Sequence, residues 1–208
     1  MADILILANS KKYKGFCVAG KDIVSNRWVR LVGDQVGAEL TLSQIIYNDI
    51  AGRRQMIPYE PFNKFIRLNI GNSVPLRYQP ENVLIGKEPW QEIQVTQNNI
   101  SYDTPVDLWG TGDRIKADNI ERGLVNVQQS LYYIKVEGLK LYYSSFERKL
   151  KRRMTFIYND IRYDLSATMN EHIFDAIQHN RCPHNNCITV SLGESFNECH
   201  YKLVAAVF

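Results

Sequence analysis

Alternating apolar and polar residues along short segments predict that this chain is built mainly from β-strands. Six segments of the first half show the pattern: 3–9, 16–24, 27–33, 63–71, 81–87 and 90–96. The first three are separated by turn-like residues and predict a meander. Thr41 and Gln44 have the spacing of a capping box, which predicts a short helix over 41–50. A second helix is expected over 113–123, with Gly123 as its stop.

The second half of the chain predicts a more specific order of elements. Segment 130–145 alternates, but its parity shifts after Gly138. This indicates one long strand bent at a glycine bulge or a two-residue hairpin, and we favour the bent strand. The following segments predict strands over 151–158 and 161–167, a helix over 168–178 capped by Thr168 and Glu171, and strands over 187–193 and 201–208. A bent strand, two strands, a helix and two strands is the order of an OB fold.

These elements predict a mostly β protein with short helices, and the order of the second half predicts one small OB-like β-barrel there. A chain of 208 residues is long enough for two small domains. Its 45% hydrophobic and 23% charged residues are typical of a folded globular protein. Twelve tyrosines and eight phenylalanines favour pleated surfaces.

The start of the chain and its cysteines bear on where the protein works. Segment 1–12 carries an acid at Asp3 and only a short apolar run, which predicts neither a signal peptide nor a membrane span. We therefore expect a cytoplasmic protein without membrane contact, whose four cysteines are reduced thiols. The net charge of +3 is mildly basic and is compatible with a local basic patch.

Segments at the start, middle and end of the chain carry a family resemblance. They read ILANSKKYKGFCVAG, WVRLVG, LRYQPENVLIG, FIYNDIRYDLSATM and SLGESFNECHYKLVAAVF. Together they resemble the bacterial dual OB-containing domain family, over nearly the whole chain. The resemblance implies two tandem OB-like β-barrels with a boundary near residues 125–130. We therefore expect the first barrel, with its inserted short helices, over residues 1–127 and the second over 128–208. The resemblance also implies nucleic-acid or nucleotide binding through the barrels. In such relatives we expect Asp-Pro after the threonine of the third strand, whereas Thr168 is followed here by Met169 and Asn170.

The strongest local charge signal lies in segment 146–154, where five cations accompany the single acid Glu147. The cations are Arg148, Lys149, Lys151, Arg152 and Arg153. Strand alternation places Lys149, Lys151 and Arg153 on one face, near Tyr142. In OB folds such a groove holds single-stranded DNA or RNA, because cations follow the phosphates and aromatic rings stack on bases. The same residues also fit a solvated edge strand, where lysines oppose aggregation.

Two polar segments are candidate sites for a nucleotide or another small ligand. The candidate residues are Ser10, Lys11, Lys14, Trp28, Arg30, Tyr78, Gln79, Glu81 and Asn82. The lysine-rich loop after the first strand can cradle a phosphate, although it is no P-loop and surface lysines also serve solubility. The residues of segment 78–82 either read a ribose or base edge in a cleft between the barrels or brace the barrel junction. Trp28 and Arg30 are expected near that segment.

A cluster of histidines and cysteines in segment 179–187 suggests zinc. His179, Cys182, His184 and Cys187 are zinc-ligand types, but they crowd into nine residues at the end of a helix and the start of a strand. We favour a polar loop and keep a zinc-binding enzyme as a minor hypothesis. No catalytic motif of the G-x-S-x-G or H-E-x-x-H type occurs. The sequence thus favours a non-catalytic binding protein without a cofactor, and it does not indicate a protein partner.

Overall fold

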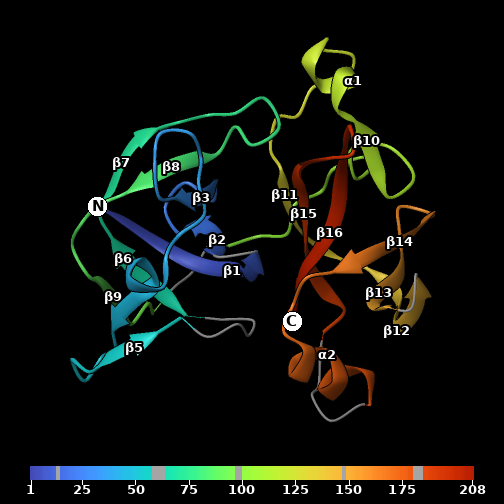
Figure 1. Cartoon of the computed structure of the whole chain (residues 1–208). Coiled ribbons are helices and arrows are strands. Elements are labelled where there is room, and N and C mark those ends of the chain that lie inside the picture. Colours follow the sequence, from blue (N-terminus) through green and yellow to red (C-terminus); the bar gives the residue numbers. More distant parts are fainter. Residues whose placement is uncertain (13–14, 58–63, 97–99, 147–148, 180–184) are drawn as a thin grey trace. The chain divides into compact units, whose positions relative to one another are not determined.

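The chain folds into two compact units. The computed structural model describes residues 1–12, 15–57, 64–96, 100–146, 149–179 and 185–208 (Figure 1). Contacts divide it into Met1–Ser101 and Tyr102–Phe208. The division falls earlier than the expected boundary after residue 127, because Arg114–Lys116 pairs with a strand of the second unit. Within the described ranges, no helix has the length and hydropathy needed to cross a bilayer.

The first unit confirms the predicted meander. Its elements are β1 (Ala2–Lys12), β2 (Gly15–Asp22), β3 (Trp28–Val32), the 3-10 helix η1 (Leu42–Ile45), β4 (Ile46–Asn48), β5 (Arg54–Met56), β6 (Phe65–Leu68), β7 (Ile70–Ser73), β8 (Asn82–Ile85) and β9 (Trp90–Ile93). The backbone N–H of Thr41 donates to Gln44 Oε1 at 2.7 Å, as the capping box predicts. The helix is shorter than predicted, because the chain enters β4 at Ile46 and pairs there with β5 and β9.

The strands of the first unit form one sheet in the order β5-β4-β9-β6-β1-β2-β3-β8-β7. Within this order, six neighbouring strands run β6-β1-β2-β3-β8-β7. Only Asn69 separates β6 from β7 in the sequence, so this run begins and ends in one segment of the chain. Within that run only β3 and β8 are parallel. The core lies between the inward faces of these strands, with Ile4, Val18, Ile45 and Trp90 buried in it.

The second unit confirms the bent strand. Its elements are β10 (Arg114–Lys116), α1 (Ala117–Glu121), β11 (Leu131–Lys135), β12 (Glu137–Phe146), β13 (Lys149–Tyr158), β14 (Ile161–Ala167), α2 (Glu171–Gln178), β15 (Cys187–Phe196) and β16 (Cys199–Val207). β11 pairs with β15 and β12 with β13, so the two halves form no hairpin with each other. Gly138 has a φ of +60° and lies where the β12/β13 register shifts, as a glycine bulge requires.

The sheet of the second unit runs β11-β15-β16-β14-β13-β12, with β10 on β16. β14 and β16 are parallel, and Val136 alone separates β11 from β12. Counted as one bent strand, β11 and β12 complete the five-strand order of an OB fold. The mostly β class is therefore confirmed. The expectation of barrels needs a correction, because no hydrogen-bonded ladder among the described strands closes either sheet into a barrel.

The two helices of the second unit have other boundaries than the sequence predicts. Asn170 caps α2, since its side chain accepts from the backbone N–H of His172 at 2.8 Å. Thr168 does not cap it, because its backbone N–H donates to Val204 of β16. The segment predicted as a helix over 113–123 begins as β10, because pairing with β16 holds it extended. Helix α1 then starts at Ala117 and ends just before Gly123, whose φ is +72°.

Candidate nucleic-acid interface

The buried positions of β13 and β14 determine which side chains face solvent. Met154 and Phe156 of β13 are buried, as are Tyr163 and Leu165 of β14, and the rings of Phe156 and Tyr163 stack with centroids 5.5 Å apart. Successive side chains of a strand point to opposite faces. The alternate positions therefore lie on the outer side of the sheet.

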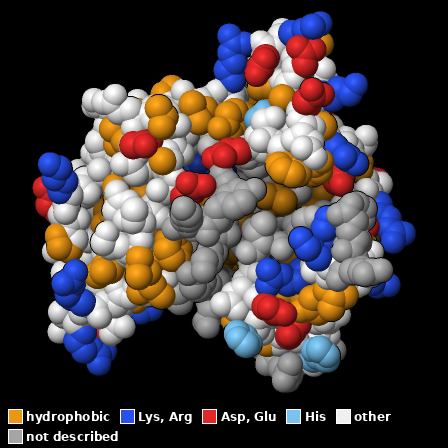
Figure 2. All heavy atoms as spheres, in the orientation of Figure 1, with side chains coloured by type: hydrophobic (Ala, Val, Ile, Leu, Met, Phe, Trp, Pro, Cys, Tyr) orange, Lys and Arg blue, Asp and Glu red, His pale blue; other side chains and the backbone are white. Residues whose placement is uncertain are grey.

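We call the outer side of β12, β13 and β14 the cationic face. Cross-strand register assigns to it Glu137, Lys140, Tyr142, Ser144, Lys149, Lys151, Arg153, Thr155, Ile157, Arg162, Asp164 and Ser166. These residues include five cations and two carboxylates, Glu137 and Asp164. The side chains of Lys140, Lys149 and Arg162 are exposed. Figure 2 shows Lys and Arg side chains gathered at the edge of the view where these strands lie.

Asp164 organises the centre of the cationic face. Its Oδ1 accepts from Arg153 Nε at 3.0 Å, and its Oδ2 accepts from the Tyr142 hydroxyl at 2.6 Å. The guanidinium of Arg153 also donates to the Asp164 carbonyl and to Ser166 Oγ. The hydrogen bond to Asp164 raises the pKa of Tyr142, so this phenol stays protonated. Arg153 is therefore a paired cation, and its guanidinium and the Tyr142 ring are fixed on the surface.

The remaining residues of the predicted basic segment do not all join this face. Arg152 lies opposite Tyr143 on the other side of β13, next to α2. The Tyr143 hydroxyl donates to Asp175 of that helix, and its ring packs edge-on against Phe174 with centroids 5.2 Å apart. Burial raises the pKa of Tyr143 to about 12. Arg148 lies outside the described residues.

The candidate ligand residues of the first unit lie mainly in its interior. The Arg30 and Glu81 side chains form an ion pair at 3.3 Å and are 8% and 6% exposed. Arg30 lies in β3, and Glu81 immediately precedes β8, the parallel neighbour of β3. Trp28, Gln79 and Asn82 are also buried. In this conformation these side chains support the β3/β8 pair and do not reach solvent.

The other residues proposed for a small ligand or a metal are not brought together. Ser10 and Tyr78 are half-buried. The side chain of Lys11 and the whole of Lys14, Cys182 and His184 lie outside the described residues. His179 Nδ1 is 2.8 Å from the Asp175 carbonyl, while Cys187 donates to the Tyr102 hydroxyl at 3.2 Å. In the part of the chain that the structure describes, no three metal-binding side chains form a group.

Sequence reasoning missed the loop 107–113, which reads DLWGTGD. The Lys202 ammonium, 1% exposed in β16, donates to the carbonyls of Gly110 and Thr111 at 2.6 and 3.3 Å. The backbone N–H of Leu108 donates to the Tyr163 hydroxyl at 3.1 Å. A lysine inside the apolar strand 201–207 was the available signal, since a buried ammonium requires acceptors.

This loop attachment predicts a pH-dependent stability. Burial lowers the pKa of Lys202 to about 8 despite the nearby carboxylates of Asp107 and Asp113, whereas the ordinary value is 10.5. Between pH 8 and pH 10.5, Lys202 is therefore mostly protonated in the unfolded chain and mostly neutral in the folded chain. The free energy of unfolding should therefore rise by about 2 kcal/mol from about pH 8 to about pH 10. Urea unfolding across this range measures it. Lys202→Met should remove this rise. If the free energy of unfolding of both proteins rises equally with pH, the prediction is wrong.

The fold is mostly β and of the OB type. In each unit, one run of neighbouring strands begins and ends in the same chain segment and contains one parallel pair, β3/β8 in the first unit and β14/β16 in the second. A family model described as the dual OB-containing domain matches residues 2–207. The chain therefore belongs to the dual OB-containing domain family. No curated protein and no solved structure matches it.

Proposed function

We propose that this protein binds single-stranded nucleic acid, without catalysis, through the cationic face of its second OB-type unit. The observation that carries the proposal is the placement of five cations against two carboxylates on the outer side of β12, β13 and β14. These strands correspond to the first three strands of an OB barrel. Ligands of OB folds bind across strands two and three.

The chemistry of the face suits a polyanion with unpaired bases. Lys140, Lys149 and Arg162 are exposed and can neutralise successive phosphates. The Tyr142 ring and the Arg153 guanidinium offer flat surfaces for stacking, and Asp164 holds both in place. Stacking accepts any base, so the face should show weak sequence preference. It also requires unstacked bases, which favours single strands over a duplex.

A salt series tests this function. Fluorescence anisotropy of a labelled oligo(dT) or oligo(U) should show binding at about 25 mM salt that weakens steadily towards about 300 mM. Three to five phosphate contacts predict a slope of log K against log salt of about −2 to −3.5, because each contact with a single strand contributes about −0.7. An equally long duplex should bind more weakly. No binding at low salt, or affinity that does not change with salt, would reject the function.

A further inference from the structure

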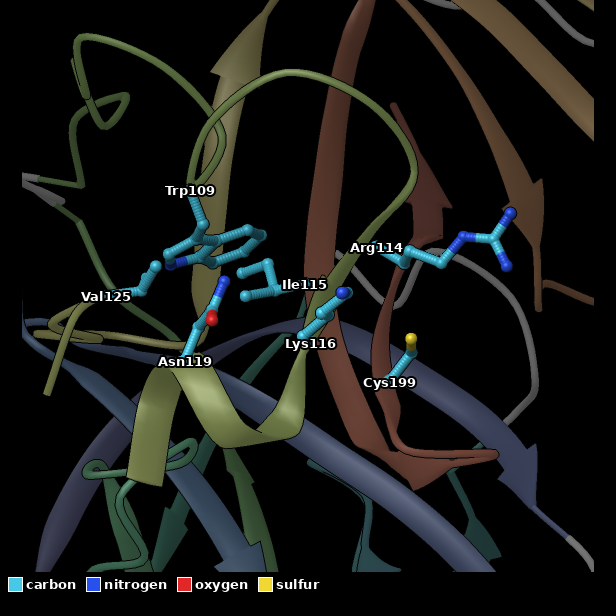
Figure 3. Close-up of a pocket in the computed structure, with 7 residues that line it drawn as sticks. All are labelled: Trp109, Arg114, Ile115, Lys116, Asn119, Val125 and Cys199. Carbon is cyan, nitrogen blue, oxygen red and sulfur yellow. The ribbon is translucent and has the colours of Figure 1, made fainter. Parts of the chain in front are cut away.

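The second unit contains a cavity on a different surface from the cationic face. Its volume is about 580 Å³. The lining residues are Trp109, Arg114, Ile115, Lys116, Asn119, Val125 and Cys199 (Figure 3). They come from the loop missed by sequence reasoning, from β10, α1 and the chain after it, and from the start of β16. None of them belongs to β12, β13 or β14. The cavity falls in the size range of small-ligand sites, roughly 300–1,000 Å³.

Trp109 forms a fixed aromatic wall of this cavity. Its indole N–H donates to the Gln129 carbonyl at 2.9 Å, and its ring lies against Tyr132 with centroids 4.6 Å apart. Its φ is +54°, an unusual conformation for a bulky residue. The buried Lys202 holds the carbonyls of the two following residues. Strained backbone of this kind persists only where the surrounding contacts impose it, and it is concentrated at ligand sites.

The polar groups of the cavity carry a positive charge. No acid is among the described lining residues, and two acids nearby form ion pairs: Asp113 with Arg114 at 3.1 Å and Asp118 with Arg122 at 2.8 Å. Lys116 is exposed and forms no ion pair with any described residue. Figure 3 shows Asn119 beside Trp109 and Val125, Lys116 between Asn119 and Cys199, and Arg114 pointing away from Trp109. An aromatic wall, an amide and an ammonium thus border one space.

We propose that this cavity binds a nucleoside phosphate. The base stacks on the Trp109 indole, the Asn119 amide bonds to the base edge, and the Lys116 ammonium binds the phosphate. Stacking and a charge-assisted contact together require a ligand that is both aromatic and anionic. Because the cavity and the cationic face share no residue, nucleotide binding and strand binding are separable properties of the second unit.

Isothermal titration with ADP tests the proposal, with adenosine and pyrophosphate as partial ligands. The full chain should bind ADP more tightly than either partial ligand. Lys116→Gln should weaken ADP binding about tenfold and leave adenosine binding unchanged, since it removes one charge-assisted contact. Asn119→Ala should weaken binding of ADP and adenosine alike. Both substituted side chains lie on the surface side of β10 and α1, so they test the site without removing a core residue.

The double variant Lys140→Gln/Arg162→Gln is the control, because it removes two cations of the same unit from the cationic face. It should bind ADP as the unchanged chain does. Absence of ADP binding at about 1 mM would overturn the nucleotide site, as would ADP binding that Lys116→Gln does not weaken. Failure of oligonucleotide binding with ADP binding intact would reject the strand-binding function alone.

Discussion

Replacement of Lys140, Lys149 and Arg162 together by glutamine is expected to weaken binding of a single-stranded oligonucleotide about a hundredfold at low salt. All three side chains are exposed on the cationic face, one on each of its three strands. Each replacement removes one phosphate contact and the counterion release that accompanies it. The salt dependence should therefore flatten by about two units of slope. Anisotropy titrations at several salt concentrations measure both quantities.

The matched control changes the same net charge in the first unit. Arg27, Arg54 and Lys87 are exposed there, and their replacement by glutamine should leave affinity within about twofold. Equal losses in the two triple variants would mean that overall charge, and not the cationic face, drives binding. That result would remove the basis for placing the interface on β12, β13 and β14.

Replacement of Glu81 by alanine is expected to lower the free energy of unfolding of the first unit by about 3 kcal/mol. Arg30 and Glu81 form an ion pair at 3.3 Å in the interior of that unit. Removal of the carboxylate leaves the guanidinium buried without this partner, and the desolvation penalty of the charge is then less well compensated. Urea unfolding followed by the fluorescence of Trp28 and Trp90, both in the first unit, measures the loss.

A double variant separates the ion pair from the packing around it. Arg30→Met combined with Glu81→Leu leaves no buried charge at this position, so its loss of stability should be smaller than that of Glu81→Ala. If the double variant loses as much stability as Arg30→Met and Glu81→Leu added together, the two side chains have no energetic coupling. The inference that the Arg30–Glu81 ion pair supports the β3/β8 pair would then be wrong.

Strand alternation was enough to predict the strands β11 to β16 of the second unit. Met154 and Phe156 alternate with polar residues, so the inner and outer faces of β13 could be assigned from the sequence. Asn159 and Asp160 form the turn after β13, and both have positive φ as a tight hairpin requires. The bend at Gly138 was likewise visible as a shift of parity.

The parts that the sequence did not predict depend on contacts between distant segments. The pairing of Asp164 with Arg153 needs the register of two strands, and Arg152 was grouped with its neighbours although it lies on the other side of β13. The Trp109 loop has no periodicity, and the lysine that holds it lies more than ninety residues away. A three-residue strand such as β10 is too short to produce a pattern, which explains the difference in domain boundary.

The position of β16 in the chain has a consequence for biosynthesis. β10, β14 and β15 all pair with β16, and all three are translated before it. On the ribosome, the first unit has all its strands once Ile93 has emerged, whereas three strands of the second unit keep unpaired edges until Cys199–Val207 is made. Unpaired edges promote aggregation, so the nascent second unit is the part that most needs chaperone protection.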